Sequence, residues 1–418
     1  MNIYFSGIGG VGIGPLAEIA LDAGYEVTGS DPEDTLITKE LLQKGISISK
    51  SQDGSFLREC HKIKTINLFV YTSALKADHP ELLLASELGI KTVKRDELIC
   101  QILSDKKLKL IAVAGTHGKT TVTGMFIWAM KQLNLPISYS IGTTITFGPS
   151  GKYNPDSEYF VYECDEFDRN FLKFNPYLSL LTSIDYDHPD TYPTKYEYLE
   201  AFHQFVKQSN QAIAWDDQHE EIYSDTPNVT LIDPTAINNE LHVLGRQNRR
   251  NAALVKAGLD KLGITDNVYE ILTAFPGTDR RFEKLADNLY SDYGHHPVEI
   301  AATLQLASEI SDHIVLVYQP HQNVRQHEIR NQYIDQFEKA EAIYWLPTYL
   351  TREDPNLPIL TPEELTRNIT NQASVHLADF NDDLWTAIQT ARRDGKLVVG
   401  MGAGKIDEWL REKLASSS

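Results

Sequence analysis

Residues 108–123 read LKLIAVAGTHGKTTVT, a stretch that combines an apolar run, two glycines and a Lys-Thr pair. Leu110–Ala114 is short and apolar, as expected for a buried parallel strand. The glycine loop Gly115–Thr121 follows at once, and helix-forming residues follow the loop. A strand, a glycine loop and a helix in this order are the context that a phosphate-binding loop requires. The stretch therefore predicts a nucleoside triphosphate site, with an ordinary glycine turn as the competing interpretation.

The residue types in this loop correspond to the parts of a polyphosphate site. Glycines allow backbone N–H groups to turn toward a polyphosphate at a helix N-terminus. Lys119 supplies a positive charge, and the Thr120 hydroxyl is suited to holding Mg²⁺. The usual motif begins with a further glycine at the position that Val113 occupies here, so the loop is a shortened variant.

The composition is that of a globular chain with several domains. A length of 418 residues suggests about two to four domains. A hydrophobic content of 42% is sufficient for packed cores. The formal net charge of −19 argues against nucleic acid or an anionic membrane surface as a partner. Helix N-termini can still bind an anionic small molecule in an acidic protein.

Cysteine usage and hydropathy predict a cytoplasmic protein. The three cysteines, Cys60, Cys100 and Cys164, are scattered and odd in number, so no disulfide framework is indicated. The first residues lack a basic region followed by an apolar stretch, so we expect no signal peptide. No apolar run approaches the roughly 20 residues that span a bilayer, so we expect no membrane insertion.

Residues 1–104 have the layout of a dinucleotide-binding unit. Ile3–Ser6 reads as a strand, Gly7–Gly12 as a glycine loop before a helix, and Tyr25–Asp31 as a second strand that ends on an acidic residue. Further strands are expected at Ile46–Ser49, Leu68–Thr72 and Lys91–Val93. Alternating strands and helices predict a parallel sheet that is covered on both faces. A unit of this kind that binds nothing is the competing interpretation.

In residues 105–274 two further strands end on acidic clusters. Tyr159–Glu163 leads into Glu163–Asp168, and Leu178–Ile184 leads into Asp185–His188. The carboxyl ends of parallel strands form the ligand-binding edge of an open α/β sheet. We therefore choose Glu163 and His188 as ligands of a second divalent ion near the triphosphate. Ordinary polar strand ends and helix caps are the alternative.

Residues 275–418 predict a third α/β unit. Expected strands follow helices here as well: Leu289–Tyr293, Ile314–Tyr318, Ala342–Trp345 and Leu397–Gly400. The adjacent His295 and His296 do not have the spacing of a structural zinc site. The predicted fold class is α/β with three domains, each a mainly parallel sheet flanked by helices. The N-terminal and C-terminal domains are Rossmann-like, and the central domain is a P-loop ATPase domain.

Several blocks, in order along nearly the whole chain, resemble one family, the Mur ligases. They are FSGIGGVGIGPLAEIALDAGYEVTGSD (5–31), VYTSALK (70–76), HPE (79–81), GTHGKTT (115–121), ECDEFDRNFL (163–172), DYDHPDTY (185–192), DRRFE (279–283), SDYGHHPVEI (291–300), YQPH (318–321) and GMGAG (400–404). Mur ligases are ATP-dependent enzymes that add amino acids to UDP-N-acetylmuramoyl precursors of peptidoglycan. The shortened glycine spacing is a feature of this family.

The resemblance implies an amide-forming ligase of peptidoglycan precursor synthesis. The blocks are most similar to the branch that joins L-alanine to UDP-N-acetylmuramate through an acyl phosphate, with release of ADP and phosphate. The implied partners are UDP-N-acetylmuramate, ATP and L-alanine, with Mg²⁺ at one or two sites. We expect a monomer or a weak homodimer that binds no nucleic acid.

The resemblance also implies roles for individual residues. The catalytic set is Lys119, Glu163, His188 and Arg281, and the metal ligands are Thr120, Glu163 and His188. The residues expected to bind ATP are Gly115, Thr116, His117, Gly118, Lys119, Thr120, Thr121, Asn248, Asn251, Arg281 and Asp292. The residues expected to line the UDP end of the substrate are Gly9, Gly10, Gly12, Ser30, Asp31 and Ser73. His321 and Arg325 are expected to bind the amino acid, and Arg281 and Asp292 to complete the site when the third domain closes.

The chain departs from the family pattern at a few positions. Gln247 replaces the histidine of the adenine-side block, and Gln322 and Gln326 interrupt the block after residues 318–321. Phe167 is closer to the branch that attaches a whole tripeptide to UDP-N-acetylmuramate during murein recycling. Lys195 lies where some relatives carry a carbamylated lysine, and we expect an ordinary exposed lysine here.

Three alternatives to L-alanine addition stay open. The tripeptide recycling reaction uses the same activation chemistry. A nicotinamide-dependent dehydrogenase is suggested by the first glycine loop alone, and the second phosphate loop counts against it. A non-catalytic nucleotide-binding protein is opposed by the intact Lys119, Thr120, Glu163 and His188.

Overall fold

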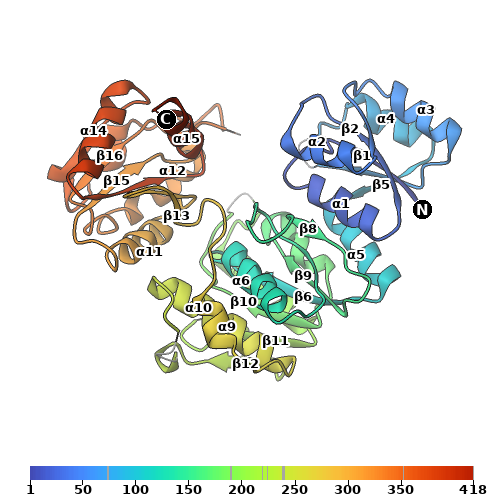
Figure 1. The fold of residues 1–418 in the computed structure, drawn as a ribbon, viewed down its shortest axis with the longest axis horizontal. Helices are drawn as coiled ribbons and strands as arrows, with labels where there is room; N and C mark the ends of the chain where they lie inside the picture. Colours follow the sequence, from blue (N-terminus) through green and yellow to red (C-terminus); the bar gives the residue numbers. More distant parts are fainter. Residues whose placement is uncertain are drawn as a thin grey trace. The chain divides into compact units, whose positions relative to one another are not determined.

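The computed structural model describes residues 1–72, 75–188, 191–218, 220–223, 225–237, 241–351 and 353–417. These residues form two compact units, each described here by itself. The first unit comprises residues 1–241 and 251–275, and the second comprises residues 242–250 and 276–418. The first unit contains two sheets and the second contains one (Figure 1).

The N-terminal sheet of the first unit is wholly parallel, in the order β3-β2-β1-β4-β5. Its strands are β1 (Asn2–Ser6), β2 (Glu26–Ser30), β3 (Ser47–Ser49), β4 (Leu68–Tyr71) and β5 (Lys91–Lys94). Its helices are α1 (Gly14–Asp22), α2 (Leu36–Gln43), α3 (Ser55–Ile63), α4 (Pro80–Glu87) and α5 (Arg95–Lys106). Alternate residues of β1 enter different clusters: Ile3 belongs to the cluster that includes Leu16 of α1, and Tyr4 to the cluster that includes Leu57 of α3. Helices therefore cover both faces of this sheet.

The central sheet also belongs to the first unit and has the order β12-β11-β10-β6-β9-β7-β8. Its strands are β6 (Lys109–Ala114), β7 (Ser138–Ser140), β8 (Gly151–Lys152), β9 (Tyr159–Glu163), β10 (Leu178–Leu181), β11 (Gln211–Trp215) and β12 (Val229–Ile232). Only the pair β7 and β8 is antiparallel among the described pairs of this sheet. The accompanying helices are α6 (Lys119–Gln132), η1 (Phe167–Lys173), α7 (Lys195–Lys207), α8 (Glu220–Tyr223), η2 (Pro234–Ala236), α9 (Arg246–Lys261) and α10 (Val268–Thr273). Strand β6 lies in the middle of the sheet, so the loop that follows it starts from a buried, fully paired strand.

The second unit contains a six-stranded sheet in the order β13-β14-β18-β15-β16-β17. Its strands are β13 (Glu283–Ala286), β14 (Leu289–Asp292), β15 (Ile314–Tyr318), β16 (Ala342–Trp345), β17 (Val375–Leu377) and β18 (Leu397–Met401). Its helices are α11 (Pro297–Ala307), α12 (Asn323–Ile329), η3 (Arg330–Gln332), α13 (Pro362–Thr366), η4 (Gln372–Ser374), α14 (Asp382–Arg393) and α15 (Ile406–Ser417). Leu316 and Val317 of β15 enter separate clusters, so both faces of this sheet are covered. Only β13 runs antiparallel to its neighbour among the described pairs.

The predicted fold class is confirmed: three sheets, all mainly parallel, are flanked by helices. The strand predicted over Leu178–Ile184 ends earlier, at Leu181. The reason is local, because the Ser183 carbonyl and hydroxyl accept hydrogen bonds from the glycine loop after β6 instead of continuing a strand ladder. None of the described helices is long and apolar enough to cross a membrane.

Candidate nucleotide and metal site

The loop after β6 needs glycine at its first position. Gly115 has a φ of +133°, and a Cβ there would lie 2.3 Å from the Thr182 hydroxyl and 2.6 Å from the Ser183 carbonyl oxygen. Both distances are shorter than any allowed contact, and an L side chain would strain this backbone conformation. Gly115 therefore lets β6 and the end of β10 approach closely.

The segment after β10 holds the rest of the loop in place. The Thr116 N–H donates to the Ser183 carbonyl at 2.8 Å, and the His117 N–H donates to the Ser183 hydroxyl at 3.0 Å. The Thr116 hydroxyl donates to the Asp185 carbonyl at 2.8 Å. These bonds fix the loop before any ligand binds, which is the preorganisation that a phosphate cradle requires.

Asn251 of α9 lies against the same loop. A Cβ on Gly118, whose φ is +89°, would lie 2.9 Å from Asn251 Oδ1. The sequence predicted Asn251 as an ATP-binding residue, and the structure brings it to the glycine loop. Asn248, its predicted companion, is half-buried in the first turn of α9.

Lys119 forms a buried ion pair with Glu166. Its ammonium donates to the Gly115 carbonyl at 2.6 Å and to Glu166 Oε2 at 2.8 Å. The Lys119 side chain is 14% exposed and the Glu166 side chain 1%. Burial lowers the pKa of Lys119, but the charges of Glu166 and Asp165 outweigh it and leave that pKa above its ordinary value. Burial raises the pKa of Glu166, which the Lys119 charge offsets in part.

Thr120 and Glu163 meet beside this ion pair, as the sequence predicted. The Thr120 hydroxyl donates to Glu163 Oε1 at 2.8 Å, and the Gly142 N–H donates to Glu163 Oε2 at 3.1 Å. A hydroxyl and a carboxylate in contact at the end of a P-loop are hard oxygen donors, so these residues fit Mg²⁺. They sit at the first turn of α6 and at the end of β9.

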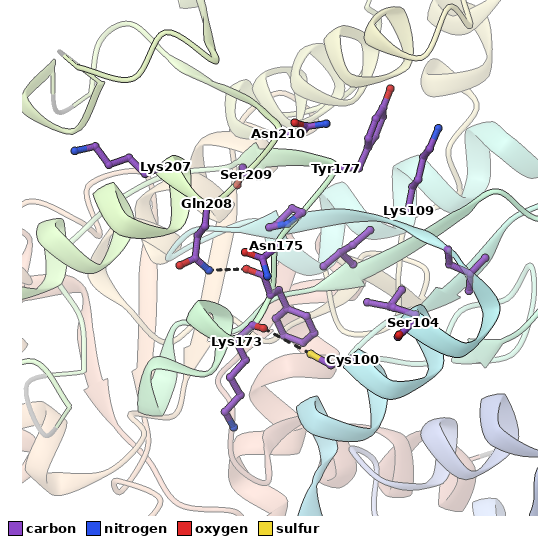
Figure 2. Close-up of a pocket in the computed structure, with 15 residues that line it drawn as sticks. Cys100, Ser104, Lys109, Lys173, Asn175, Tyr177, Lys207, Gln208, Ser209 and Asn210 are labelled. Carbon is purple, nitrogen blue, oxygen red and sulfur yellow. Dashed lines mark hydrogen bonds between the residues drawn. The ribbon is translucent and has the colours of Figure 1, made fainter. Parts of the chain in front are cut away.

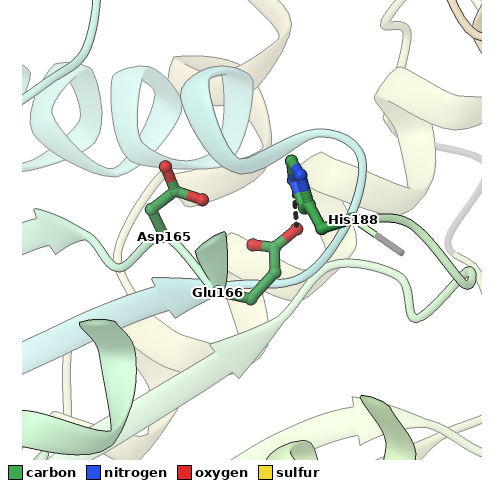
Figure 3. A group of neighbouring side chains, drawn as sticks. All are labelled: Asp165, Glu166 and His188. Carbon is green, nitrogen blue, oxygen red and sulfur yellow. Dashed lines mark ion pairs between the residues drawn. The ribbon is translucent and has the colours of Figure 1, made fainter. Parts of the chain in front are cut away.

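His188 joins a second group of possible metal ligands. One ligand atom each from Asp165, Glu166 and His188 lies within 4.8 Å of the other two (Figure 3). The Nε2 atom of His188 is 3.9 Å from Glu166 Oε1. The sequence analysis paired His188 with Glu163, whereas the structure gathers it with the two carboxylates that follow Cys164. Sequence reasoning quoted this acidic cluster but did not select those two.

Phe167 packs beside the same histidine. The ring centroids of Phe167 and His188 are 5.3 Å apart. His188 itself has a φ of +57°, and Asp168 and Arg169 also have positive φ values. Left-handed backbone in non-glycine residues is costly and concentrates at functional sites. The residue that suggested the tripeptide branch therefore lies next to the predicted metal ligand.

Hydrogen bonds hold the glycine loop that follows β1 of the N-terminal sheet. The Gly9 N–H donates to Asp31 Oδ2 at 2.8 Å, and the buried Ser30 hydroxyl donates to Glu81 Oε2 at 2.8 Å. Asp31 thus supports the loop, as does the Ser30 carbonyl, which accepts the Gly7 N–H at 2.8 Å. Gly10 and Gly12 are exposed at its surface. Ser73, which was also predicted to line the UDP end, lies outside the described residues.

In the second unit the two predicted ATP-facing residues are neighbours. Asp292 accepts backbone N–H groups from Phe282 at 2.9 Å and Gly294 at 2.7 Å. Burial raises the pKa of Asp292 to about 6, although the nearby Arg281 charge opposes this rise. The Arg281 guanidinium carbon lies 5.1 Å from the centre of the Tyr293 ring.

The two predicted amino-acid-binding residues gather around His295, which sequence reasoning did not select. The rings of His295 and His321 have centroids 5.4 Å apart, and Arg325 Nη1 lies 2.5 Å from His295 Nε2. Arginine can only donate, so Nε2 is the acceptor and Nδ1 carries the proton that faces the Tyr293 carbonyl. Burial and then the nearby cations lower the pKa of His295 to about 4, against the opposing charge of Glu299.

Gln326 and Lys195 also occupy positions singled out from the sequence, and the first is buried while the second is exposed. Gln326 is fully buried, donates to the His321 carbonyl at 3.1 Å and accepts the Tyr333 hydroxyl at 2.7 Å. Gln326 therefore orients the segment that carries His321. Lys195 is exposed at the start of α7, the setting expected for an unmodified lysine.

A cavity of about 650 Å³ lies at the other edge of the central sheet (Figure 2). It is lined where β6, β10 and β11 begin, and the P-loop follows the opposite end of β6. Lys109 and Lys207 line it, but they pair with Glu158 and Asp225. Because it lies at the opposite end of the strands from the P-loop, the cavity has no part in the site above.

The P-loop, the oxygen ligands beside it and the three α/β sheets define an enzyme that uses a nucleoside triphosphate. Sequence models of one family match in three consecutive segments. They are "Mur ligase family, catalytic domain" at residues 2–107, "Mur ligase middle domain" at 113–238 and "Mur ligase, glutamate ligase domain" at 280–404. The chain belongs to the Mur ligase family, the ATP-dependent ligases of peptidoglycan synthesis, which generally require Mg²⁺.

Two relatives are similar over nearly the whole chain. A UDP-N-acetylmuramate–L-alanine ligase from Carboxydothermus hydrogenoformans is 30% identical, over 98% of this chain and 95% of the relative. One from Caldicellulosiruptor bescii is 28% identical, over 98% of each chain.

Solved structures share the fold. A UDP-N-acetylmuramate–alanine ligase from Thermotoga maritima superposes with a TM-score of 0.76 at 24% identity, over 100% of both chains. A murein peptide ligase from Psychrobacter arcticus gives 0.64 at 22% identity, over 100% of this chain and 98% of that one.

Proposed function

We propose that this Mur ligase joins L-alanine to UDP-N-acetylmuramate and converts ATP to ADP and phosphate. The two relatives of nearly equal length are named for this reaction. The structural observation that carries the proposal is the P-loop cluster, in which Lys119 and the Thr120–Glu163 pair lie side by side at the end of the central sheet. This cluster supplies the positive charge and oxygen ligands that phosphoryl transfer from ATP demands.

The chemistry follows from the difficulty of making an amide from a carboxylate. The oxygen of a carboxylate is a poor leaving group at neutral pH, so one of its oxygens attacks the γ-phosphorus and ADP leaves. The neutral amine of L-alanine then attacks the acyl phosphate and expels phosphate. The ammonium of Lys119 stabilises the charge of the transferring phosphoryl group, since that group carries its negative charge on oxygen throughout.

We propose two Mg²⁺ sites. Thr120 and Glu163 would hold the ion that accompanies ATP, and His188 would hold a second ion with Glu163 or with Asp165 and Glu166. Bound Mg²⁺ supplies charge neutralisation for the phosphoryl oxygens and the acyl carboxylate. Asp165 and Glu166 are added to the sequence-based choice because their ligand atoms lie near that of His188.

We assign the binding of the three substrates to the three predicted domains. We propose that residues 1–104 bind the UDP-linked substrate, residues 105–274 bind ATP, and residues 275–418 bind the amino acid. Arg281 and Asp292 are the proposed ATP-facing residues of the last domain, and His321 and Arg325 the proposed partners of the amino-acid carboxylate. An arginine fork suits a carboxylate.

A second acceptor has one observation in its favour. Phe167, the residue closer to the tripeptide-recycling branch, contacts the ring of His188 at the predicted metal site. Acceptor preference is tested by offering L-alanine, L-serine, glycine and L-alanyl-γ-D-glutamyl-meso-diaminopimelate separately, with UDP-N-acetylmuramate and ATP. Phosphate release is expected to be fastest with L-alanine. Release with the tripeptide alone would instead assign the recycling reaction.

We further propose that the protein acts in the cytoplasm as a monomer or a weak homodimer, without membrane insertion or nucleic acid as a partner. The net charge of −19 supports the last point. Sedimentation analysis at several protein concentrations tests the oligomeric state.

A further inference from the structure

Helix α12, which carries Arg325, is capped from outside its own segment. Its first two residues are Asn323 and Val324, and the N–H groups of a first turn find no carbonyl within the helix. The residue before them, Gln322, has a φ of +60°, and its side chain donates to the Thr351 carbonyl at 3.4 Å. Serine, threonine, aspartate and asparagine are the usual capping residues, so a glutamine here leaves the cap to another part of the chain.

Glu353, from the loop after β16, supplies this cap. Its Oε1 atom accepts the Asn323 N–H at 3.0 Å, and its Oε2 atom accepts the Val324 N–H at 3.1 Å. Oε1 also accepts the Thr351 N–H at 2.9 Å, which fixes the carboxylate to its own loop. Hydrogen bonds from N–H groups at a helix N-terminus to a carboxylate are roughly twice as strong as neutral ones. One carboxylate therefore satisfies the first two N–H groups of α12.

The buried side chain of Asn323 ties the same loop to α12 a second time. Its Nδ2 atom donates to the Pro358 carbonyl at 3.0 Å, and its Oδ1 atom accepts the Leu360 N–H at 2.9 Å. Both ends of this amide are thus used, as a buried polar group requires. The loop after β16 therefore fixes where α12 starts, and with it the backbone position of Arg325.

We propose that Glu353 is a positioning residue for the carboxylate of the amino acid, because it caps α12 and so holds Arg325 against His295. This rests on the proposed function, in which His321 and Arg325 bind that carboxylate. Glu353 already accepts the first two N–H groups of α12, so the substrate carboxylate cannot use them and depends on the guanidinium of Arg325. A displacement of about 1 Å in that guanidinium would weaken its fork of donors to the carboxylate.

Steady-state kinetics with L-alanine as the varied substrate test this role, at saturating ATP and UDP-N-acetylmuramate. Glu353→Gln replaces one oxygen by an amide nitrogen, which cannot accept an N–H, so one of the two bonds to the first turn is lost. We expect the KM for L-alanine to rise by about tenfold while kcat stays within about twofold, because binding is weakened and the chemical step is not. Glu353→Asp keeps the charge but is one methylene shorter, so its KM should lie between those of the wild type and Glu353→Gln.

A second helix of the same unit supplies the matched control. The Asn381 side chain accepts the Leu384 N–H at 3.0 Å and so caps α14. Asn381→Ala removes that cap and should leave the KM for L-alanine unchanged. Amide hydrogen exchange gives a readout that needs no substrate: the amides of α12 should exchange faster in Glu353→Gln than in the wild type, and no faster in Asn381→Ala.

A KM for L-alanine equal to that of the wild type in a folded Glu353→Gln variant would overturn the proposal, and so would a fall in kcat alone or unchanged exchange of the α12 amides. Equal rises in KM for Glu353→Gln and Asn381→Ala would also overturn it, because the effect would then follow from lost stability. If Glu353→Gln fails to fold by circular dichroism, Glu353→Asp carries the same comparison, and a wild-type KM in it would contradict the proposal. Failure of the wild type to release phosphate with any acceptor would instead refute the proposed function, and hydrogen exchange would still test the cap.

Discussion

The ammonium of Lys119 lies 2.8 Å from Glu166 Oε2, and Glu166 Oε1 lies 3.9 Å from His188 Nε2. One buried carboxylate therefore faces both the P-loop lysine and the predicted metal-binding histidine. The Tyr192 hydroxyl donates to the Glu166 backbone carbonyl at 2.6 Å, which holds this segment in place. Glu166 thus lies between two groups that we propose take part in phosphoryl transfer.

Lys119→Ala should remove ATP-dependent phosphate release in a protein that still folds but is less stable, because the buried Glu166 carboxylate loses its partner. Removing a single preorganised hydrogen-bond donor from an oxyanion hole costs about 10²–10³ in kcat, and we expect at least the lower figure for the charged Lys119. Phosphate release and circular dichroism would be measured together. Lys195→Ala, at an exposed lysine, is the control and should keep full activity. Substantial turnover by Lys119→Ala would contradict the assignment of this loop as the site of phosphoryl transfer.

Glu166→Gln should destabilise the protein, because it leaves the buried Lys119 charge without its partner. Breaking a buried ion pair on one side costs about 3–5 kcal/mol. The double variant Lys119→Ala with Glu166→Gln should lose less than the sum of the two single variants, since the charges are coupled. Thermal unfolding of the four proteins gives the coupling. Strictly additive losses of unfolding free energy would show that the two charges do not stabilise each other.

Glu163→Gln should raise the Mg²⁺ concentration required for half-maximal phosphate release. A carboxylate bonded to the Thr120 hydroxyl is a better Mg²⁺ ligand than an amide, so we expect a shift of about tenfold or more, as for disrupted metal sites in general. Glu158→Gln is the control, because Glu158 precedes the same strand and pairs with Lys109 at the surface. An identical Mg²⁺ dependence in the two variants would contradict the assignment.

The second unit should lose stability as the pH falls from about 6.5 to about 4. His295 is buried as a neutral ring with a pKa near 4, against 6.5 in its ordinary state, so the unfolded chain binds the extra proton first. The free energy of unfolding carries no penalty from His295 above pH 6.5, and it is lower by about 3 kcal/mol at and below pH 4. Carboxyl groups also titrate in this window. The quantity to measure is therefore the difference in the free energy of unfolding between the wild type and His295→Gln.

That difference should shrink toward low pH as the wild type loses its His295 contribution. His376→Gln, at an exposed histidine of the same unit, is the matched control. Its difference from the wild type should not depend on pH in this way. A constant difference for His295→Gln across the window would show that the ring is not held neutral.

Much of the architecture could be predicted from residue patterns. The bounds expected for Tyr159–Glu163, Ile314–Tyr318 and Ala342–Trp345 are those of β9, β15 and β16. These strands lie inside their sheets and are apolar along their length, so the pattern is strong. The edge strands β8 and β17 were not predicted, because Gly151–Lys152 and Val375–Leu377 are short and carry little apolar signal.

The site was predictable where chemistry follows a local motif. Lys119, Thr120 and Glu163 lie as expected, because a P-loop and the adjacent strand end fix them. The role of Glu166 was missed because the chain leaves β9 through an irregular turn, and sequence does not show which carboxylate of the cluster points to the lysine.

The central claim is that ATP activates the substrate carboxylate as an acyl phosphate before L-alanine attacks. The most direct test uses UDP-N-acetylmuramate labelled with ¹⁸O in its carboxylate, with ATP and L-alanine, and mass analysis of the released phosphate. We expect each released phosphate to carry one oxygen from the carboxylate, because that oxygen attacks phosphorus and leaves with it. Phosphate without the label, alongside formation of the L-alanyl product, would contradict it.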